Sequence, residues 1–330
     1  KAFAIDSLGR IVVVGGNRIA RFTADGALDT TFSDDGWATD DHVGTTCHGI
    51  TIEADGNYLV AGRDNEHFRL SRWTPDGTRT KTYDRDVSPP GQYNHSNYRD
   101  RDYARAVIAK DDGDILIIGV SGGRTNYPYR DLRSHAVVRL NRDMGFEAEY
   151  MYDFGSEANE FVNSALALPD GKFLMVGQSD DQLAVSRYLS SGEKDTSFGS
   201  NGLVELPILN GSDVGIRATL AADGKILISG YAHNGSNEDL TVTRLNYDGS
   251  VDDTFGTNGS VSFDISGGMD KGAAIASLAD GKILVAGRAG NEIALVRLLG
   301  DSDQTAAATN QAPVNSVPAA QTTLINQPLA

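Results

Sequence analysis

The stretch ADGKILVAGRAGNEIALVRL, residues 279–298, contains the pattern that decides the fold. An Asp-Gly pair precedes a continuous apolar run that ends in glycine, and a second apolar segment then leads to an arginine. Asp-Gly is typical of a tight hairpin turn, because glycine adopts positive φ freely. An apolar run without alternation is typical of a strand buried on both faces. The stretch therefore predicts two adjacent antiparallel strands.

This pattern occurs six times along the chain, at spacings of 47 to 58 residues. The turn glycines are Gly9, Gly56, Gly113, Gly171, Gly224 and Gly281. The arginines are Arg21, Arg72, Arg139, Arg187, Arg244 and Arg297. A run of small residues before each turn and a further segment after a second glycine turn supply two more strands. The repeat is therefore a four-stranded unit.

Six such units predict an all-β fold, a six-bladed β-propeller of four-stranded antiparallel blades closed into a ring. The small-residue strands favour the propeller, because the innermost strands around a narrow channel need small side chains. The alternative is a stacked β-solenoid. The predicted propeller spans residues 1–303, followed by an extended tail at 304–330.

Composition excludes several classes of protein. The 330 residues carry a formal net charge of -16, which argues against a nucleic-acid partner. Cys47 is the single cysteine, so disulfide scaffolds and multi-cysteine zinc sites are excluded. No apolar run approaches the roughly 18 residues of a membrane span, so we expect no direct membrane insertion. The chain starts at Lys1 rather than Met, and we expect that a preceding segment, for which a secretory signal is one candidate, has been removed.

The repeat also resembles a known family. Three units continue with similar segments: LDTTFSDDG (28–36), KDTSFGSNG (194–202) and VDDTFGTNG (251–259). Together with DGKILVAG and ALVRL, this pattern resembles the delta-sixty repeat family of bacterial secreted and surface proteins. The match covers residues 1–300 and is strongest in the last three units. The resemblance implies a propeller-like array in a large extracellular bacterial protein, and it transfers no catalytic residues.

The tail differs in character from the repeats. Residues 304–330 contain no charged or aromatic residue and three of the nine prolines, which is typical of a linker. NQAPVNSVP (310–318) resembles the start of bacterial cadherin-like or Ig-like repeats. The sixth unit lacks its fourth strand, and an open sheet edge invites pairing. We therefore expect part of the tail, Thr322–Asn326, to pair with that edge, in the same chain or in a neighbouring subunit.

The repeated polar and aromatic residues predict scaffold contacts. An arginine that ends an apolar strand face usually lays its stem on the core and pairs its head with a nearby acid or carbonyl. Asp29, Asp195 and Asp252 in the following turns are the expected partners. Phe32, Phe198 and Phe255 are expected to fill the space between blades. Cys47, beside His48 and near His42, is interpreted as a small buried thiol.

Function on a repeat scaffold is expected where the repeat is interrupted. Two insertions, 78–103 and 120–135, hold six of the 12 tyrosines and an excess of positive charge. Strand direction places both on one face, where the small-residue strands also begin. The predicted ligand-binding residues are His48, Tyr93, His95, Tyr98, Arg99, Arg105, Arg124, Tyr127, Tyr129 and Arg130.

These residues favour binding rather than catalysis. Tyrosine supplies flat apolar area with a polar tip, and arginine grips carboxylate or sulfate bidentately. We therefore predict a binding or adhesion module of a bacterial cell-surface protein, with a glycan or protein ligand and no catalytic residue. One alternative is a subunit of an extracellular filament that self-associates through 304–330, and a second is a carbohydrate-active propeller enzyme.

The sequence indicates neither a cofactor nor a metal site. Acidic pairs on the loop face, at Asp40–Asp41, Asp180–Asp181 and Glu238–Asp239, leave Ca²⁺ open as a ligand, although their spacing matches no known motif. We expect these pairs to be solvated loops.

Overall fold

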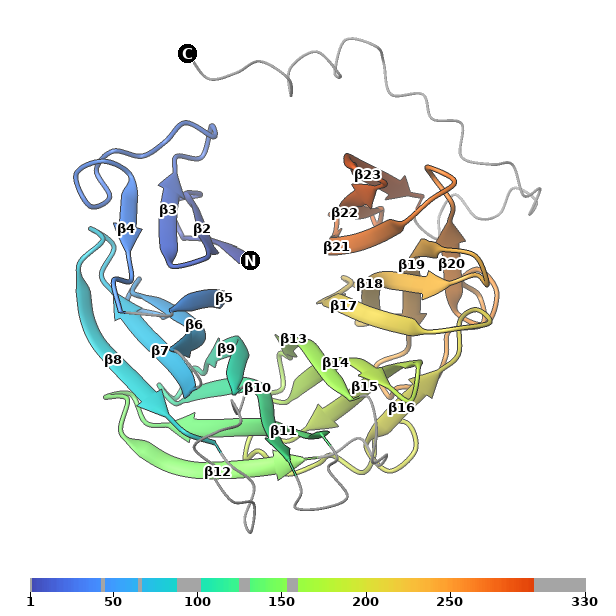
Figure 1. Ribbon diagram of the computed structural model, residues 1–330, viewed down its shortest axis with the longest axis horizontal. Coiled ribbons are helices and arrows are strands. Elements are labelled where there is room, and N and C mark those ends of the chain that lie inside the picture. Colours follow the sequence, from blue (N-terminus) through green and yellow to red (C-terminus); the bar gives the residue numbers. More distant parts are fainter. Residues whose placement is uncertain are drawn as a thin grey trace.

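The computed structural model describes residues 2–42, 45–64, 67–87, 102–124, 131–152 and 160–299, and for residues 122–124 and 131–134 it describes the backbone alone. The described chain forms six antiparallel sheets arranged as blades around a centre, as Figure 1 shows. The prediction of a six-bladed β-propeller is therefore confirmed. Within each blade, successive strands along the chain are neighbours in the sheet.

The six blades follow one another in sequence order. Blade one contains β1 (Ala2–Ile5), β2 (Ile11–Gly15), β3 (Arg18–Phe22) and β4 (Trp37–Thr39). Blade two contains β5 (Thr46–Ile52), β6 (Tyr58–Asp64), β7 (His67–Trp73) and β8 (Arg79–Arg85). Blade three contains β9 (Tyr103–Ala109), β10 (Ile115–Arg124), β11 (Asp131–Leu140) and β12 (Phe146–Tyr152).

The second half of the chain repeats this arrangement. Blade four contains β13 (Phe161–Ala167), β14 (Phe173–Ser179), β15 (Gln182–Tyr188) and β16 (Leu203–Leu206). Blade five contains β17 (Asp213–Leu220), β18 (Ile226–His233), β19 (Glu238–Leu245) and β20 (Ser260–Phe263). Blade six contains β21 (Asp270–Ser277), β22 (Ile283–Ala289) and β23 (Glu292–Leu298).

Blade six has three strands within the described part of the chain, as the interrupted repeat predicts. The tail at 304–330, and with it the predicted pairing of Thr322–Asn326, lies outside the described residues. The first strand of every blade lies nearest the centre in Figure 1, so the small-residue strands line the channel.

The hydrophobic core lies between neighbouring blades. Every residue of β14 is buried, which explains why this apolar run shows no alternation. Leu174 and Val176 on one of its faces pack with Ile226 and Ile228 of blade five. Met175, on the opposite face, belongs to the cluster shared with blade three. Each middle strand therefore contributes to two interfaces between blades.

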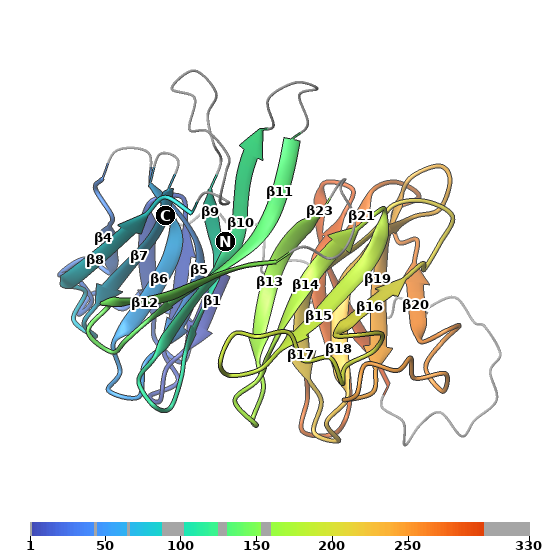
Figure 2. The same cartoon turned by 90° about the horizontal axis from the view of Figure 1, so that it is seen from below.

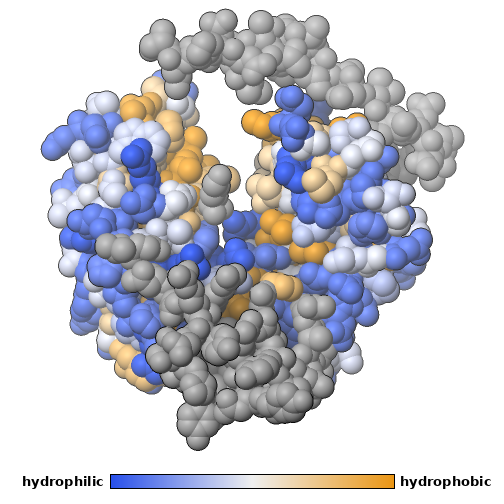
Figure 3. Space-filling model, viewed as in Figure 1, coloured by the Kyte–Doolittle hydropathy of each residue, from blue (hydrophilic) through white to orange (hydrophobic). Residues whose placement is uncertain are grey.

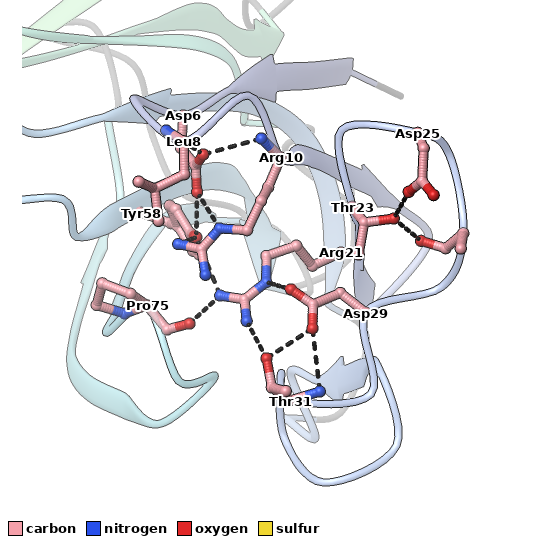
Figure 4. Close-up of polar contacts among 11 residues, drawn as sticks. Asp6, Leu8, Arg10, Arg21, Thr23, Asp25, Asp29, Thr31, Tyr58 and Pro75 are labelled. Carbon is pink, nitrogen blue, oxygen red and sulfur yellow. Dashed lines mark hydrogen bonds and ion pairs between the residues drawn. The ribbon is translucent and has the colours of Figure 1, made fainter.

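The repeated arginines join consecutive blades. Figure 4 shows Arg21 of blade one, whose Nε lies 2.7 Å from Asp29 Oδ2, while its Nη1 donates to the backbone carbonyl of Pro75 in blade two. Arg187 makes the same contacts one half-turn of the ring away, with Nε 2.8 Å from Asp195 Oδ2 and Nη1 2.5 Å from the carbonyl of Tyr247 in blade five. The predicted role as scaffold is confirmed for these arginines.

Blade five uses the same turn aspartate, whereas blade two uses a different acid. Arg244 Nε lies 2.6 Å from Asp252 Oδ2, as predicted. Arg72 instead pairs with Glu53 at 2.7 Å and donates to the carbonyl of Arg142 in blade three. The acid comes from the turn before β6 in this case, because blade two lacks the LDTTF segment of its neighbours.

The two insertions contain more regular structure than expected. Arg79–Arg85 of the first insertion forms β8, the outer strand of blade two, and Tyr83 is partly buried against the core. Much of the second insertion lengthens β10 and β11 to 10 residues each. Figure 2 shows this hairpin projecting beyond the other strands on one face of the ring. The interrupted repeat therefore continues as paired strands, because an extended hairpin satisfies its own backbone hydrogen bonds.

The ring is not closed between blades one and six. Figure 1 shows an open sector there, and Figure 3 shows that it remains open in the space-filling view, with hydrophobic surface on both sides. Phe3 and Ile5 of β1 are 57% and 61% exposed. Leu295 of β23 is 65% exposed. The expected closed ring is thus incomplete in the part of the chain that the structure describes.

Candidate functional site

A β-bulge recurs in the innermost strand of five blades, always at the same position of the repeat. In blade two, Cys47 pairs with Gly62 and Gly49 pairs with Ala61, so His48 is the extra residue. The equivalent extra residues in blades three to six are Arg105, Asn163, Ile216 and Ala273. Bulges re-aim a side chain and are common beside functional sites. We call these five residues the bulge ring.

The glycine that ends each apolar run explains the bulge. A Cβ on Gly230 would lie 1.9 Å from the carbonyl oxygen of Val214, and a Cβ on Gly62 equally close to that of Thr46. Both contacts are far below van der Waals separation, so the bulged backbone can approach only where the opposite strand has glycine. The last glycine of the DGKILVAG motif is therefore a structural requirement of the bulge ring.

The bulge ring is polar in blades two to four and apolar in blades five and six. His48, Arg105 and Asn163 are all partly buried, and Asn163 Nδ2 donates to the carbonyl of Gly215 in blade five at 2.9 Å. His48 and Arg105 are among the ligand-binding residues predicted from the sequence. The structure places them at equivalent positions on neighbouring innermost strands, which brings the two predicted site residues His48 and Arg105 together.

Positive charge is concentrated at this position. Burial and, after it, the charge of Arg105 lower the pKa of His48 to about 4, so this imidazole is neutral at neutral pH. Burial and the charge of Arg105 also lower the pKa of Arg217 on β17. The charge of Arg105 in blade three thus influences groups in blades two and five.

Arg105 is the central group of this cluster. Its guanidinium lies over the ring of Tyr103, with Cζ 4.5 Å from the ring centroid. The centroid of the His48 ring lies 6.3 Å from that of Tyr103. The Arg105 Nε is buried and has no hydrogen-bond partner among the described residues. A buried donor of this kind is costly unless a ligand or water satisfies it, and an anion would also offset the repulsion from Arg217.

The insertions are anchored beside this cluster. Tyr103 begins β9 and pairs with Val120 of β10, at the end of blade three from which β10 and β11 project. Both insertions therefore leave the same end of blade three, as predicted. Eight predicted site residues belong to them. Tyr93, His95, Tyr98, Arg99, Tyr127, Tyr129 and Arg130 lie outside the described residues, and Arg124 is described by its backbone alone.

Basic side chains contact two of the three acidic pairs, and Asp40 is buried rather than solvated. Arg69 and Arg79 contact Asp40 at 2.9 and 2.7 Å, and Arg79 also contacts Asp41 at 3.0 Å. Glu238 pairs with Lys271 at 2.9 Å. In the described ranges no group of three or more His, Cys, Asp or Glu side chains is arranged to hold a metal ion.

Cys47 and His42 lie in separate environments. Cys47 is buried in the core between blades one and two, as expected, and burial raises the pKa of its thiol to about 12. His42 Nδ1 instead lies 2.8 Å from Asp64 Oδ2.

Comparison with known proteins agrees with this architecture. A family described as a domain of unknown function (DUF5122) β-propeller matches residues 9–32, 221–255 and 278–303. The chain is a propeller repeat protein. The matched segments cover well under half of the sequence and include the glycine turns and arginines of blades one, five and six. The delta-sixty resemblance and the cadherin-like or Ig-like start of the tail stay predictions. No curated protein matches the sequence.

Solved structures of several kinds are similar in fold. A streptogramin B lyase has a TM-score of 0.53 at 17% identity, covering 90% of this chain and 78% of the lyase. A luciferin-regenerating enzyme has a TM-score of 0.50 at 13% identity, covering 92% and 86%. A protein from Lactobacillus plantarum has a TM-score of 0.50 at 12% identity, covering 88% and 79%. Identities this low support the fold alone. No helix in the described ranges is long and apolar enough to cross a membrane.

Sequence reasoning missed Arg217 and the bulges themselves. The signal was present in the last glycine of each apolar run, which recurs where no turn is needed. Such a glycine inside a strand pattern marks a bulge or a close backbone approach. The electrostatic influence of Arg105 on Arg217 had no local signal, because their strands are separated by more than 100 residues and belong to different blades.

Proposed function

We propose that this protein is an extracellular binding module of a bacterial surface protein, and that it holds a carboxylate or sulfate group of an anionic glycan at the channel mouth. The observation that supports the proposal best is Arg105, whose buried Nε lacks a partner among the described residues in a neighbourhood of positive charge. The rest of the chain carries net negative charge, so this local reversal is specific to the site.

The proposed geometry uses three side chains. Arg105 supplies the charge-assisted hydrogen bonds, and such bonds to a carboxylate are stronger than neutral ones. Tyr103, which lies under the guanidinium, fixes its plane and offers an aromatic face to a sugar ring. His48 is neutral at neutral pH and can accept or donate one hydrogen bond to a hydroxyl. The ligand-binding residues predicted in the two insertions would enlarge the binding surface formed by Arg105, Tyr103 and His48.

Calorimetric titration with an oligogalacturonate, against a neutral dextran oligosaccharide of equal length, tests the proposal. We expect the oligogalacturonate to bind more tightly, with an affinity that falls as salt increases. Arg105→Ala should weaken binding by about tenfold to a hundredfold, since a hydrogen bond to a charged group contributes roughly 1.5–3 kcal/mol. Arg18→Ala is the matched control, because Arg18 is an exposed arginine at the start of β3 in blade one.

Two outcomes separate the parts of the proposal. If Arg105→Ala and Arg18→Ala bind the anionic sugar equally well, Arg105 is not the contact and the proposed site is wrong. If an acidic peptide binds through Arg105 while the sugar does not, the ligand is a protein and the glycan assignment is wrong. Tyr93→Ala and Tyr127→Ala test whether the insertions take part.

A further inference from the structure

Three of the interfaces between consecutive blades, those of blades one and two, three and four, and four and five, share one feature, an aromatic ring placed over a glycine of the next blade. A Cβ added at Gly77 would lie 3.2 Å from Phe32 Cδ2, and one at Gly249 would lie 2.9 Å from Phe198 Cδ2. In blade four, a Cβ at Gly192 would lie 2.6 Å from Tyr150 Cε2. Each glycine belongs to the second glycine turn of its blade. We call the ring the plug and the glycine turn its seat.

The equivalent seat in blade one is empty. Gly26 has a φ of +87°, close to the +93°, +98° and +90° of Gly77, Gly192 and Gly249. No atom of the described chain lies within 4 Å of a Cβ added at Gly26. The seat is thus formed in blade one, but the preceding blade that would fill it is not among the described residues.

The second strand of blade one also exposes an apolar side chain that is buried at the equivalent positions of blades four and five. Val13 of β2 is 37% exposed, whereas Ile228, at the same position of blade five, is 2% exposed. Met175, at the same position of blade four, is fully buried. A repeat exposes an apolar face where it lacks a neighbour, because each repeat buries its faces only against the next.

Blade six shows the complementary deficiency. Ile293 and Leu295 of β23 are 75% and 65% exposed, whereas Leu240 and Val242, at the same positions of blade five, are fully buried. Contiguous apolar surface of this kind marks an interaction site. The open sector thus has an unfilled seat on one side and an uncovered blade face on the other. Figure 3 shows hydrophobic surface on both sides of it.

The sequence after β23 offers no ring of the kind that fills the seats of Gly77, Gly192 and Gly249. Residues 299–330 contain no phenylalanine, tyrosine or tryptophan, so blade six has no plug for Gly26. Phe32, Phe198 and Phe255 are buried in interfaces of their own, at 0%, 0% and 2% exposure. A second copy of the chain could therefore offer one of these rings only by opening an existing interface.

We propose that the sector between blades one and six binds one further blade of the same repeat type, contributed by a polypeptide outside these 330 residues. The partner carries an Asp-Thr-x-Phe-Gly segment like that of blade four, and its phenylalanine occupies the seat at Gly26. Its two apolar faces cover Val13, Phe3 and Ile5 on one side, and Ile293 and Leu295 on the other. This proposal is independent of the ligand site at Arg105.

An extended chain tests the proposal directly. A copy of residues 160–215, placed before Lys1, supplies blade four and the first part of an innermost strand in the register set by Gly9 and Gly224. We expect amide exchange in β1 and β23 to slow by about tenfold or more relative to the 330-residue protein, because both strands lose an open face. The same extension with alanine at the copied Phe198 is the matched control and should lose most of this protection at β1.

Glycine substitutions provide a second measurement that does not depend on the extension folding perfectly. Gly26→Ala and Gly249→Ala introduce similar backbone strain, but only the second meets a plug. In the 330-residue protein Gly26→Ala should lower the thermal midpoint less than Gly249→Ala, and in the extended protein the two should become similar. Equal effects in the 330-residue protein would show that blade six already closes on blade one and would overturn the proposal. Unchanged exchange in β1 and β23 on extension would overturn it as well.

Discussion

The interface between blades four and five and the sector between blades six and one are made from the same repeat, yet only the first is complete. Between blades four and five, Phe198 is buried over Gly249 and Arg187 bridges to the carbonyl of Tyr247. In the open sector, Gly26 has no ring above it and Leu295 is 65% exposed. A blade taken alone therefore buries only part of its apolar surface. Packing between neighbouring blades supplies the rest of the burial that stabilises the propeller.

Removal of the plug should have the largest effect. Phe198→Ala leaves a cavity in a fully buried site and is expected to lower the free energy of unfolding by about 4 kcal/mol. Leu295→Ala, in the open sector, should change it by less than about 0.5 kcal/mol. Urea unfolding followed by fluorescence measures both. Similar losses for the two variants would mean that the sector is covered in solution and that the contrast between the two regions is wrong.

Removal of the bridging arginine should come next. Arg187→Ala leaves Asp195 buried with Lys172 as its remaining cationic partner, at 2.9 Å, and should cost about 3 kcal/mol. Arg297, the counterpart in blade six, is exposed, so Arg297→Ala should be nearly neutral. The same unfolding experiment compares the two. A large loss for Arg297→Ala would indicate that this arginine also bridges to a neighbouring blade.

Stability should depend on pH differently for a carboxylate at an interface between blades and for the imidazole at the channel. Burial alone would raise the pKa of Asp195, but hydrogen bonds from Ser197 and Lys172 and the charge of Arg187 hold it well below its usual range. The stability that this carboxylate contributes is therefore present above its unfolded pKa, near 3.9, and is lost as pH falls toward the lower folded value. Asp195→Asn should flatten the stability profile below pH of about 4.

His48 should act in a different and higher pH window. Its folded pKa of about 4 lies below its usual 6.5, so the unfolded chain takes up the proton first and stability falls as pH drops between these values. His48→Asn should remove part of this loss, about 1 kcal/mol after allowance for its partial exposure. Chemical denaturation at intervals from pH 7 to pH 4 measures the effect. A profile that His48→Asn leaves unaltered in this window would argue against a buried neutral imidazole at the channel.

Much of the architecture could be predicted from the sequence because short motifs, repeated along the chain, specify it. The Asp-Gly turns, the apolar runs and the arginines determine four-stranded units without reference to distant contacts, and the partners Asp29, Asp195 and Asp252 follow from proximity along the chain. The interruption of the sixth repeat likewise predicts a blade with three described strands. Local hydrogen bonding and burial are sufficient for these features.

The remaining features depend on how the blades are arranged around the ring. His48, Arg105 and Arg217 lie on three separate blades, and only the curvature of the ring brings the two other groups under the influence of the Arg105 charge. The empty seat at Gly26 is also invisible in the sequence, where this turn looks like its counterparts at Gly77 and Gly249. The structure of a single blade follows from the amino-acid sequence, because turn geometry and strand burial act over short distances. Only the tertiary structure decided which blade faces lack a neighbour, because that depends on the angle accumulated over the whole ring.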